Sequence, residues 1–214
     1  MTVKAVLWDF GGVVLSSPFE AFNAYETEIG LPLDSIRKIN ALNPDSNAWA
    51  RMERAEIGLD EFARLFEAEA ASHGHSLSGQ RILGLLSGEV RPEMVEALKR
   101  VKSRYRIACI TNNMPLGEGP GMMRTPDKAR QVAEIMALFE HVVESSKLGM
   151  RKPDPRIYQH ACRLLGVEPE DCVYLDDLGV NLKPAKAMGM QTIKVQSAAQ
   201  ALGELERIID MPLR

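Results

Sequence analysis

The sequence has little of what marks secreted, membrane-spanning or nucleic-acid-binding proteins. Its 214 residues include three cysteines, an odd number whose spacing forms no metal-ligand or redox motif. We expect these thiols to be buried and reduced, which favours a reducing compartment. No apolar run is long enough to cross a bilayer. The net charge of -3 provides no basic surface for nucleic acid.

The N-terminal region also lacks a recognisable targeting signal. Its apolar stretch is interrupted by Asp9 and has no cleavage-site pattern, so we expect no signal peptide. Together these absences favour a cytoplasmic protein with neither a membrane nor a nucleic-acid partner. They leave the oligomeric state open between a monomer and a homodimer.

What the sequence does contain is a series of short apolar runs, most of them alternating with helical patterns. Strands are expected at residues 3–8, 106–110, 142–143, 172–175 and 192–195. Such alternation predicts an α/β fold with a parallel sheet that is covered by helices on both faces. A chain of this length can bury that core and still hold a sizeable insertion.

The insertion is expected between the first and second strands. There the apolar residues recur with helical spacing, as in Phe62, Leu65 and Phe66. We therefore expect a helical unit of residues 16–88, and a core made of residues 1–15 and 89–214. A later segment, residues 114–126, is rich in glycine and proline and is expected to form a loop near the entrance of a site.

Polar residues follow three of the expected strands at the point where each strand ends. Asp9 follows the first strand, Thr111 and Asn112 follow the second, and Asp176 and Asp177 follow a later one. Because the carboxyl ends of parallel strands share one edge of a sheet, we expect these side chains to converge.

Carboxylates that converge in this way repel one another, and burial would drive protons onto them. A hard divalent cation relieves the repulsion. The all-oxygen donor set of Asp9, Asp176 and Asp177, without histidine or cysteine, favours Mg²⁺ over zinc. An ionised aspartate can also attack phosphorus and form an aspartyl-phosphate.

Phosphoryl transfer further needs donors and positive charge for the phosphoryl oxygens. Thr111 and Asn112 supply neutral donors, and Lys152 supplies a charge next to the stiff Pro153–Asp154–Pro155 segment. The backbone amides of Gly11 and Gly12 could approach a phosphate closely because no Cβ is in the way.

Four segments of the sequence resemble, in order, the four motifs of the haloacid dehalogenase (HAD) superfamily. They are Asp9–Phe10–Gly11–Gly12–Val13, Ile110–Thr111–Asn112, Lys152–Pro153–Asp154–Pro155, and the segment Leu175 to Asn181, which reads LDDLGVN. The similarity spans nearly the whole chain. The wording from Glu144 to Tyr158 is most similar to the N-terminal phosphatase domain of soluble epoxide hydrolases and to a related domain fused to some acyl-CoA dehydrogenases.

The resemblance implies a Rossmann-like core, a helical cap over residues 16–88 and a set of site roles. Asp9 would be the nucleophile and a metal ligand, and the Gly11 carbonyl and Asp177 would be further ligands of Mg²⁺. Asp176 and Asn181 would hold the outer shell of the metal and Lys152. The residues expected to contact the phosphoryl group of a small phosphorylated substrate are Gly11, Gly12, Thr111, Asn112 and Lys152.

One residue departs from the family pattern. Most phosphatases of the superfamily carry a second aspartate, the acid that protonates the leaving group, two residues after the nucleophile, where this sequence has Gly11. General acid catalysis is typically worth about 10²–10⁴-fold in rate. We therefore expect a phosphomonoesterase that is slow on poor leaving groups. The alternatives are a catalytically weak or silent phosphate-binding module and a 2-haloacid dehalogenase.

Overall fold

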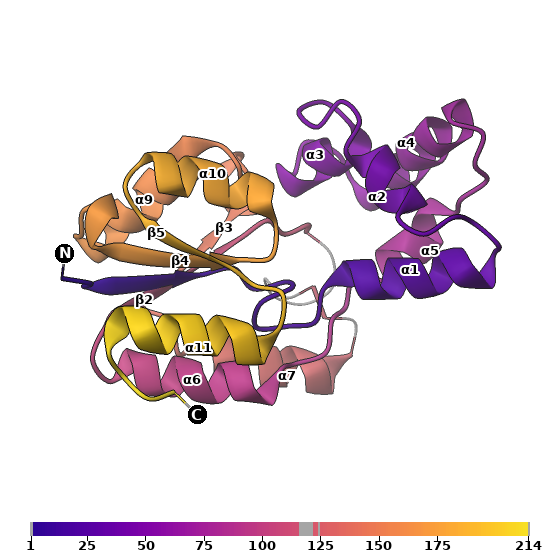
Figure 1. Ribbon diagram of the computed structural model, residues 1–214. Helices are drawn as coiled ribbons and strands as arrows, with labels where there is room; N and C mark the ends of the chain where they lie inside the picture. Colours follow the sequence, from indigo (N-terminus) through magenta and orange to yellow (C-terminus); the bar gives the residue numbers. More distant parts are fainter. Residues whose placement is uncertain (1, 116–121, 124, 214) are drawn as a thin grey trace.

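A five-stranded parallel sheet organises one part of the molecule (Figure 1). The computed structural model describes residues 2–115, 122–123 and 125–213. The strand order is β3-β2-β1-β4-β5, and every neighbouring pair is parallel. The strands are β1 (Ala5–Trp8), β2 (Arg106–Thr111), β3 (His141–Glu144), β4 (Cys172–Asp176) and β5 (Gln191–Lys194). The predicted α/β class is confirmed, and the five predicted strands are present with slightly different ends.

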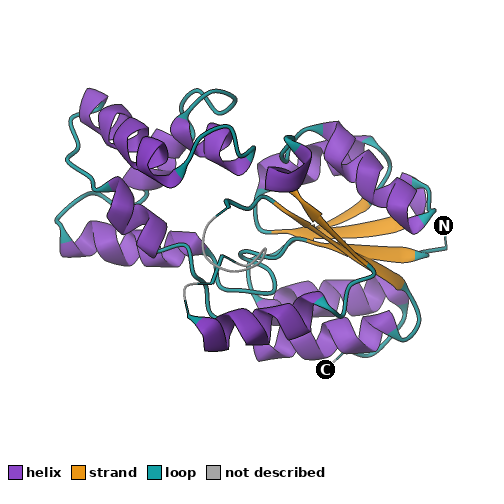
Figure 2. Cartoon of the chain, turned by 180° about the vertical axis from the view of Figure 1, so that it is seen from behind, coloured by secondary structure: helices purple, strands orange, loops and turns teal. Residues whose placement is uncertain are grey.

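Helices cover both faces of this sheet (Figures 1 and 2). They are α6 (Pro92–Lys102), α7 (Pro126–Met136) and α11 (Ala198–Ile209) on one face, and α9 (Pro155–Leu165) and α10 (Gly179–Ala187) on the other. Successive side chains of a strand point to opposite faces. Val6 and Trp8 accordingly pack with the first three helices, and Ala5 and Leu7 pack with the other two. Burial on both faces explains why the central strands read as continuous apolar runs.

Short elements complete this part of the chain. They are α8 (Ser145–Leu148) and a 3-10 turn at Pro169–Asp171. Helix α9 begins as the sequence suggests, because the Asp154 carboxylate accepts a hydrogen bond of 2.9 Å from the Arg156 amide and Pro155 occupies the first turn.

A separate group of helices lies beyond the carboxyl ends of the strands (Figure 1). This helical group consists of α1 (Pro18–Glu28), α2 (Ser35–Asn40), α3 (Ala48–Glu53), α4 (Leu59–Ser72) and α5 (Gly79–Gly84). It has its own core, in which Phe22, Phe62, Phe66 and Ile82 are fully buried. Leu65 of the predicted stripe is only partly buried and packs against that core.

The chain passes between the sheet and the helical group twice, and the two passages lie side by side. Leu15 and Val90 form an isolated antiparallel bridge, and the Ser16 amide donates to the Glu89 carbonyl at 2.7 Å. This pairing holds together the two segments by which the chain enters and leaves the helical group. The predicted loop at 114–126 includes residues 116–121 and 124, which lie outside the described part of the chain. No helix within that described part is both long and apolar enough to cross a bilayer.

Candidate active site

Three acidic side chains meet at the carboxyl edge of the sheet. Asp9 follows β1, and Asp176 and Asp177 lie at the end of β4, the strand that pairs with β1. The Asp9 amide donates to the Leu175 carbonyl at 2.8 Å, which continues the ladder to the edge. One carboxylate oxygen from each aspartate lies within 4.8 Å of those of the other two. The convergence expected from the strand ends is present.

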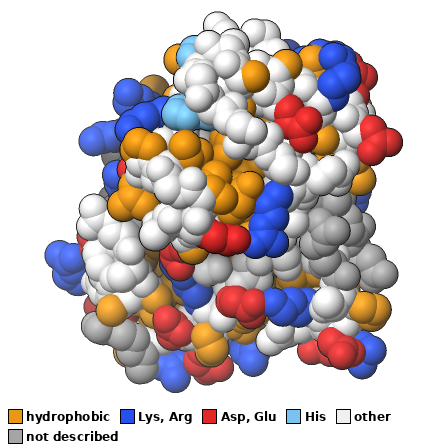
Figure 3. Space-filling view, turned by 90° about the vertical axis from the view of Figure 1, so that its right-hand side faces the viewer, with side chains coloured by type: hydrophobic (Ala, Val, Ile, Leu, Met, Phe, Trp, Pro, Cys, Tyr) orange, Lys and Arg blue, Asp and Glu red, His pale blue; other side chains and the backbone are white. Residues whose placement is uncertain are grey.

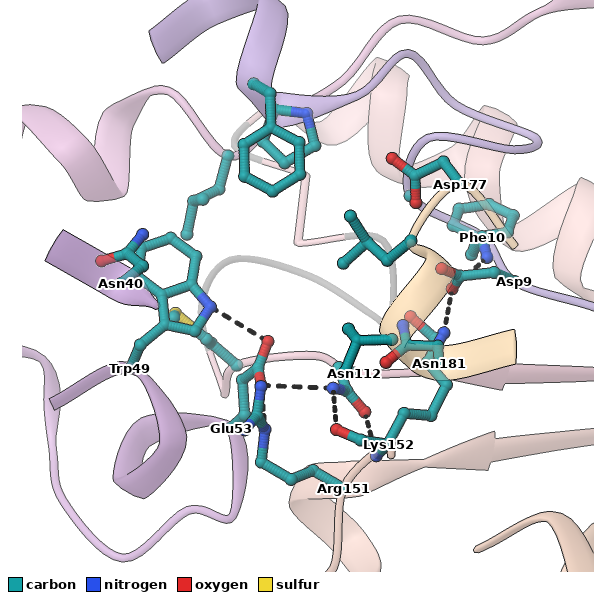
Figure 4. A pocket seen from close by; sticks show the side chains of 18 of the residues that line it. Asp9, Phe10, Asn40, Trp49, Glu53, Asn112, Arg151, Lys152, Asp177 and Asn181 are labelled. Atoms are coloured by element: carbon teal, nitrogen blue, oxygen red, sulfur yellow. Dashed lines mark hydrogen bonds and ion pairs between the residues drawn. The ribbon is translucent and has the colours of Figure 1, made fainter. Parts of the chain in front are cut away.

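Lys152 lies against two of these carboxylates. Its Nζ is 2.7 Å from Asp9 Oδ1 (Figure 4). The same Nζ is 2.9 Å from Asp176 Oδ2, and the side chain is 1% exposed. Burial by itself would lower the pKa of Lys152, but the carboxylates of Asp176 and Asp9 outweigh it and raise that pKa above its ordinary value. Lys152 is therefore a buried ammonium group throughout the physiological pH range.

The carboxylate of Asp9 is held in a fixed orientation. Its Oδ1 accepts the Phe10 amide at 2.6 Å as well as Lys152, and the residue is 7% exposed. Burial raises the pKa of Asp9 well above its ordinary value; Lys152 opposes this effect, and Asp176 and Asp177 add to it. One ammonium group against three carboxylates leaves an excess of negative charge, which a divalent cation would balance.

The two neighbouring aspartates differ in how far protein donors already satisfy them. Asp176 accepts from Lys152, the Tyr174 hydroxyl, the Asn181 amide at 3.1 Å and the Leu178 backbone at 2.8 Å. Asp177 is half-buried and accepts from Ser17 at 3.2 Å. Burial and the nearby Asp176 raise the pKa of Asp177 to about 6. The arrangement therefore fits Asp9 and Asp177 as cation ligands and Asp176 as the residue that anchors Lys152 and Asn181. An all-oxygen donor set of this kind suits Mg²⁺.

Gly11 and Gly12 occupy different environments in the turn after Asp9. Gly12 has a φ of +77°, and a Cβ there would lie 2.3 Å from Asp177 Oδ2. Its carbonyl accepts a hydrogen bond of 3.0 Å from Arg91. A Cβ at Gly11 would meet no heavy atom within 4 Å. Gly12 is thus required by its backbone and by close approach of Asp177, whereas Gly11 faces open space.

Asn112 is engaged by Lys152 rather than left free. Its Oδ1 accepts the Lys152 amide at 2.8 Å, and its Nδ2 donates to the Lys152 carbonyl at 3.0 Å (Figure 4). This pairing was not expected from the sequence, from which we predicted a phosphoryl contact for the same side chain. Thr111, by contrast, is buried at the end of β2 and lines the cavity over the carboxylates.

A cavity of about 630 Å³ opens between these polar residues and the helical group. The aspartates and Lys152 lie at one end, and the wall is largely apolar. Its apolar members include Leu15, Phe19, Trp49, Leu86, Met114 and Met122. Figure 3 views the molecule from the side of the helical group, where hydrophobic side chains gather among acidic and basic ones.

Two charged residues at this cavity were not singled out from the sequence. Glu53 ends α3, and Arg151 precedes Lys152; they form an ion pair in which the nitrogen and oxygen are 2.5 Å apart. Trp49 donates to the same carboxylate at 3.1 Å. A sequence pattern gives no signal for Glu53, because its partners on the sheet side, Asn112 and Arg151, are distant in the chain.

Comparison with known proteins places these features in a family. The family model described as haloacid dehalogenase-like hydrolase matches residues 3–189. Acyl-CoA dehydrogenase family member 10 of Mus musculus is 33% identical over 98% of this chain and 19% of its own length. Bifunctional epoxide hydrolase 2 of Mus musculus is 28% identical over 97% of this chain and 39% of its own length. The chain thus spans well under half of these relatives.

A shorter relative and two solved structures match most of their own length. A phosphatase of Mycobacterium tuberculosis is 26% identical over 94% of this chain and 90% of its own length. A mutant HAD family enzyme of Bacteroides thetaiotaomicron, solved with magnesium and inorganic phosphate, has a TM-score of 0.63 at 18% identity and covers 95% and 98% of the two chains. A dehalogenase solved as an intermediate complex has a TM-score of 0.68 at 18% identity and covers 98% of each chain. The two structures establish the fold.

Proposed function

Because the chain belongs to the haloacid dehalogenase-like hydrolases, we propose that it is a Mg²⁺-dependent phosphomonoesterase that acts through an aspartyl-phosphate intermediate. The observation that carries this proposal is the cluster of Asp9, Lys152 and Asp177 at one end of the cavity. Its relatives include a protein named as a phosphatase.

Asp9 is the proposed nucleophile. A carboxylate oxygen forms a bond to phosphorus while the bond from phosphorus to the leaving-group oxygen breaks, and water then hydrolyses the acyl phosphate to regenerate Asp9. Lys152 stays charged and 2.7 Å from Asp9, so it can offset the charge on the transferring group. Thr111 and the Gly11 amide are the proposed donors to the remaining phosphoryl oxygens, because the Gly12 amide donates to the Ser16 carbonyl at 3.4 Å.

The metal is proposed to bind to Asp9, Asp177 and the Gly11 carbonyl, with Asp176 and Asn181 in its outer shell. When bound, Mg²⁺ supplies positive charge for the phosphoryl oxygens. Helices α1–α5 are proposed to act as the cap, in keeping with the expected division between residues 16–88 and the rest. The apolar wall around Phe19 and Trp49 suits a small phosphorylated metabolite with an apolar body.

The test is a comparison of wild type and Asp9→Asn with a panel of phosphate monoesters. We expect turnover by wild type in Mg²⁺, loss of turnover in EDTA, recovery when Mg²⁺ is restored, and at least about a 10³-fold loss in Asp9→Asn. Wild-type rates in Asp9→Asn would refute the assigned nucleophile.

The presence of glycine at position 11, where an acid is expected, supports a second candidate function. In that case the protein is a phosphate-binding module with little or no turnover. With no acid at that position, the pocket could bind a phosphate group and leave it intact. That candidate predicts that inorganic phosphate binds with Mg²⁺ in calorimetry while no monoester in the panel is hydrolysed. Hydrolysis of any panel member that depends on Asp9 would exclude it.

A further inference from the structure

Glu53, at the end of α3, contacts residues of the sheet side that lie next to Lys152. Its carboxylate is 9% exposed although it lies at the boundary of the cavity. It accepts from three side chains, namely Trp49 of its own helix, Arg151 and Asn112. The last two belong to the sheet side of the molecule. Its backbone carbonyl also accepts the Ser145 hydroxyl at 2.7 Å.

The contact with Asn112 leads directly to Asp9. Asn112 Nδ2 lies 3.3 Å from Glu53 Oε2 and 3.0 Å from the Lys152 carbonyl, so one amide group serves both acceptors (Figure 4). Asn112 Oδ1 accepts the Lys152 amide, and Lys152 Nζ reaches Asp9. Glu53 therefore helps to fix which way the Asn112 amide faces, and that orientation sets the backbone that carries Lys152.

We propose that Glu53 is a positioning residue that places Lys152 against Asp9 through Asn112 when the helical group is seated on the sheet. The kinetic effect of Glu53 rests on the proposed function. The contacts of Glu53 are observed in the structure and do not depend on that function. Glu53 does not touch Asp9 or the phosphoryl position in this arrangement, so its effect is indirect. The rival explanation is that Glu53 and Arg151 only fasten the two parts together.

The first test compares Glu53→Gln with Glu69→Gln, a matched change within the helical group. Glu69 accepts the Ala48 amide at 2.8 Å and contacts the helical group rather than Lys152 or Asn112. Losing a hydrogen bond to a charged group that keeps Lys152 in place in the transition state should lower the rate by about tenfold or more. We expect Glu53→Gln to lower kcat by about this factor with little change in KM, and Glu69→Gln to leave both within about twofold. Equal effects from the two variants would overturn the proposal.

A second test separates positioning from fastening. Arg151→Met leaves the Glu53 carboxylate without its cationic partner, and Glu53→Met added to it removes that buried charge, which typically restores stability. If Glu53 only fastens, the double variant is at least as active as Arg151→Met. If Glu53 positions Lys152, the double variant is more stable in thermal unfolding and yet at least about fivefold slower than Arg151→Met. This comparison also covers the case in which Glu53→Gln fails to fold.

A structural readout keeps the proposal separate from the proposed function. A crystal structure of Glu53→Gln is expected to show the Asn112 amide turned away from the Lys152 backbone and Lys152 Nζ withdrawn from Asp9. An unchanged Asn112–Lys152 pair would overturn the positioning role even if the wild type hydrolyses phosphate esters. Absence of turnover in wild type would instead overturn the proposed function and leave this structural outcome decisive.

Discussion

At the scale of single residues, the two glycines after Asp9 have opposite tolerance for a side chain. A Cβ on Gly12 would collide with the Asp177 carboxylate, and one on Gly11 would meet nothing. We expect Gly12→Ala to lose stability by about 1–3 kcal/mol because of its positive φ and this collision. Gly11→Ala should cost much less. Urea unfolding of the two variants measures the difference, and equal midpoints would contradict it.

The open space at Gly11 also makes the missing acid restorable. Gly11→Asp adds a carboxyl group where the superfamily pattern has one, at a position where a Cβ meets no heavy atom within 4 Å. We expect it to speed hydrolysis of alkyl phosphates by about 10-fold or more, within the range typical of general acid catalysis. Aryl phosphates with good leaving groups need little protonation and should change much less. Rates of both classes in wild type and variant decide this, and no gain with alkyl phosphates would mean that another group already supplies the proton.

At the scale of elements, the helix after Lys152 begins with a strong N-cap. The Asp154 carboxylate bonds the Arg156 amide and its guanidinium, and Arg156 is the largest cause that lowers the pKa of Asp154 below its ordinary 3.8. We expect Asp154→Ala to lower the free energy of unfolding by about 1 kcal/mol at neutral pH. Because a lowered native pKa stabilises the fold only above the unfolded value, this difference should shrink as pH falls below about 4. Urea unfolding at pH 7 and pH 3 tests it, and a constant difference would contradict the charge argument.

Among the elements, the strands and the convergence of the aspartates could be predicted from the sequence, but two side-chain pairs could not. Apolar runs located the strands, and parallel pairing then brought Asp9 and Asp177 together, because strand ends share an edge whatever the loops do. The contact of Lys152 with Asp176 was expected from the resemblance of the Lys152–Pro153–Asp154–Pro155 segment to a superfamily motif. The Asn112–Lys152 backbone pair and the Glu53–Arg151 ion pair could not be predicted, since both depend on side-chain directions across distant segments. The ion pair in addition joins the helical group to the sheet side.

At the scale of the whole molecule, the cavity lies between two parts that each carry a tryptophan in a different setting. Trp8, in β1, is fully buried on one face of the sheet, and Trp49 lines the cavity. We expect phenyl phosphate with Mg²⁺ to change the fluorescence of the Asp9→Asn variant through Trp49. A titration measures the response, and adding Trp49→Phe should remove it. A response that survives Trp49→Phe would place the ligand elsewhere.

The bridge between Leu15 and Val90 lies where the chain crosses between the sheet and the helical group. The two crossings of the chain are paired there, while α3 meets the sheet side through Glu53 and Arg151. A rotation of the helical group about this bridge would open the cavity most at the side farthest from Leu15 and Val90. Substrate and product would then pass through the same opening. The Glu53–Arg151 ion pair, next to Lys152, lines the cavity at this boundary.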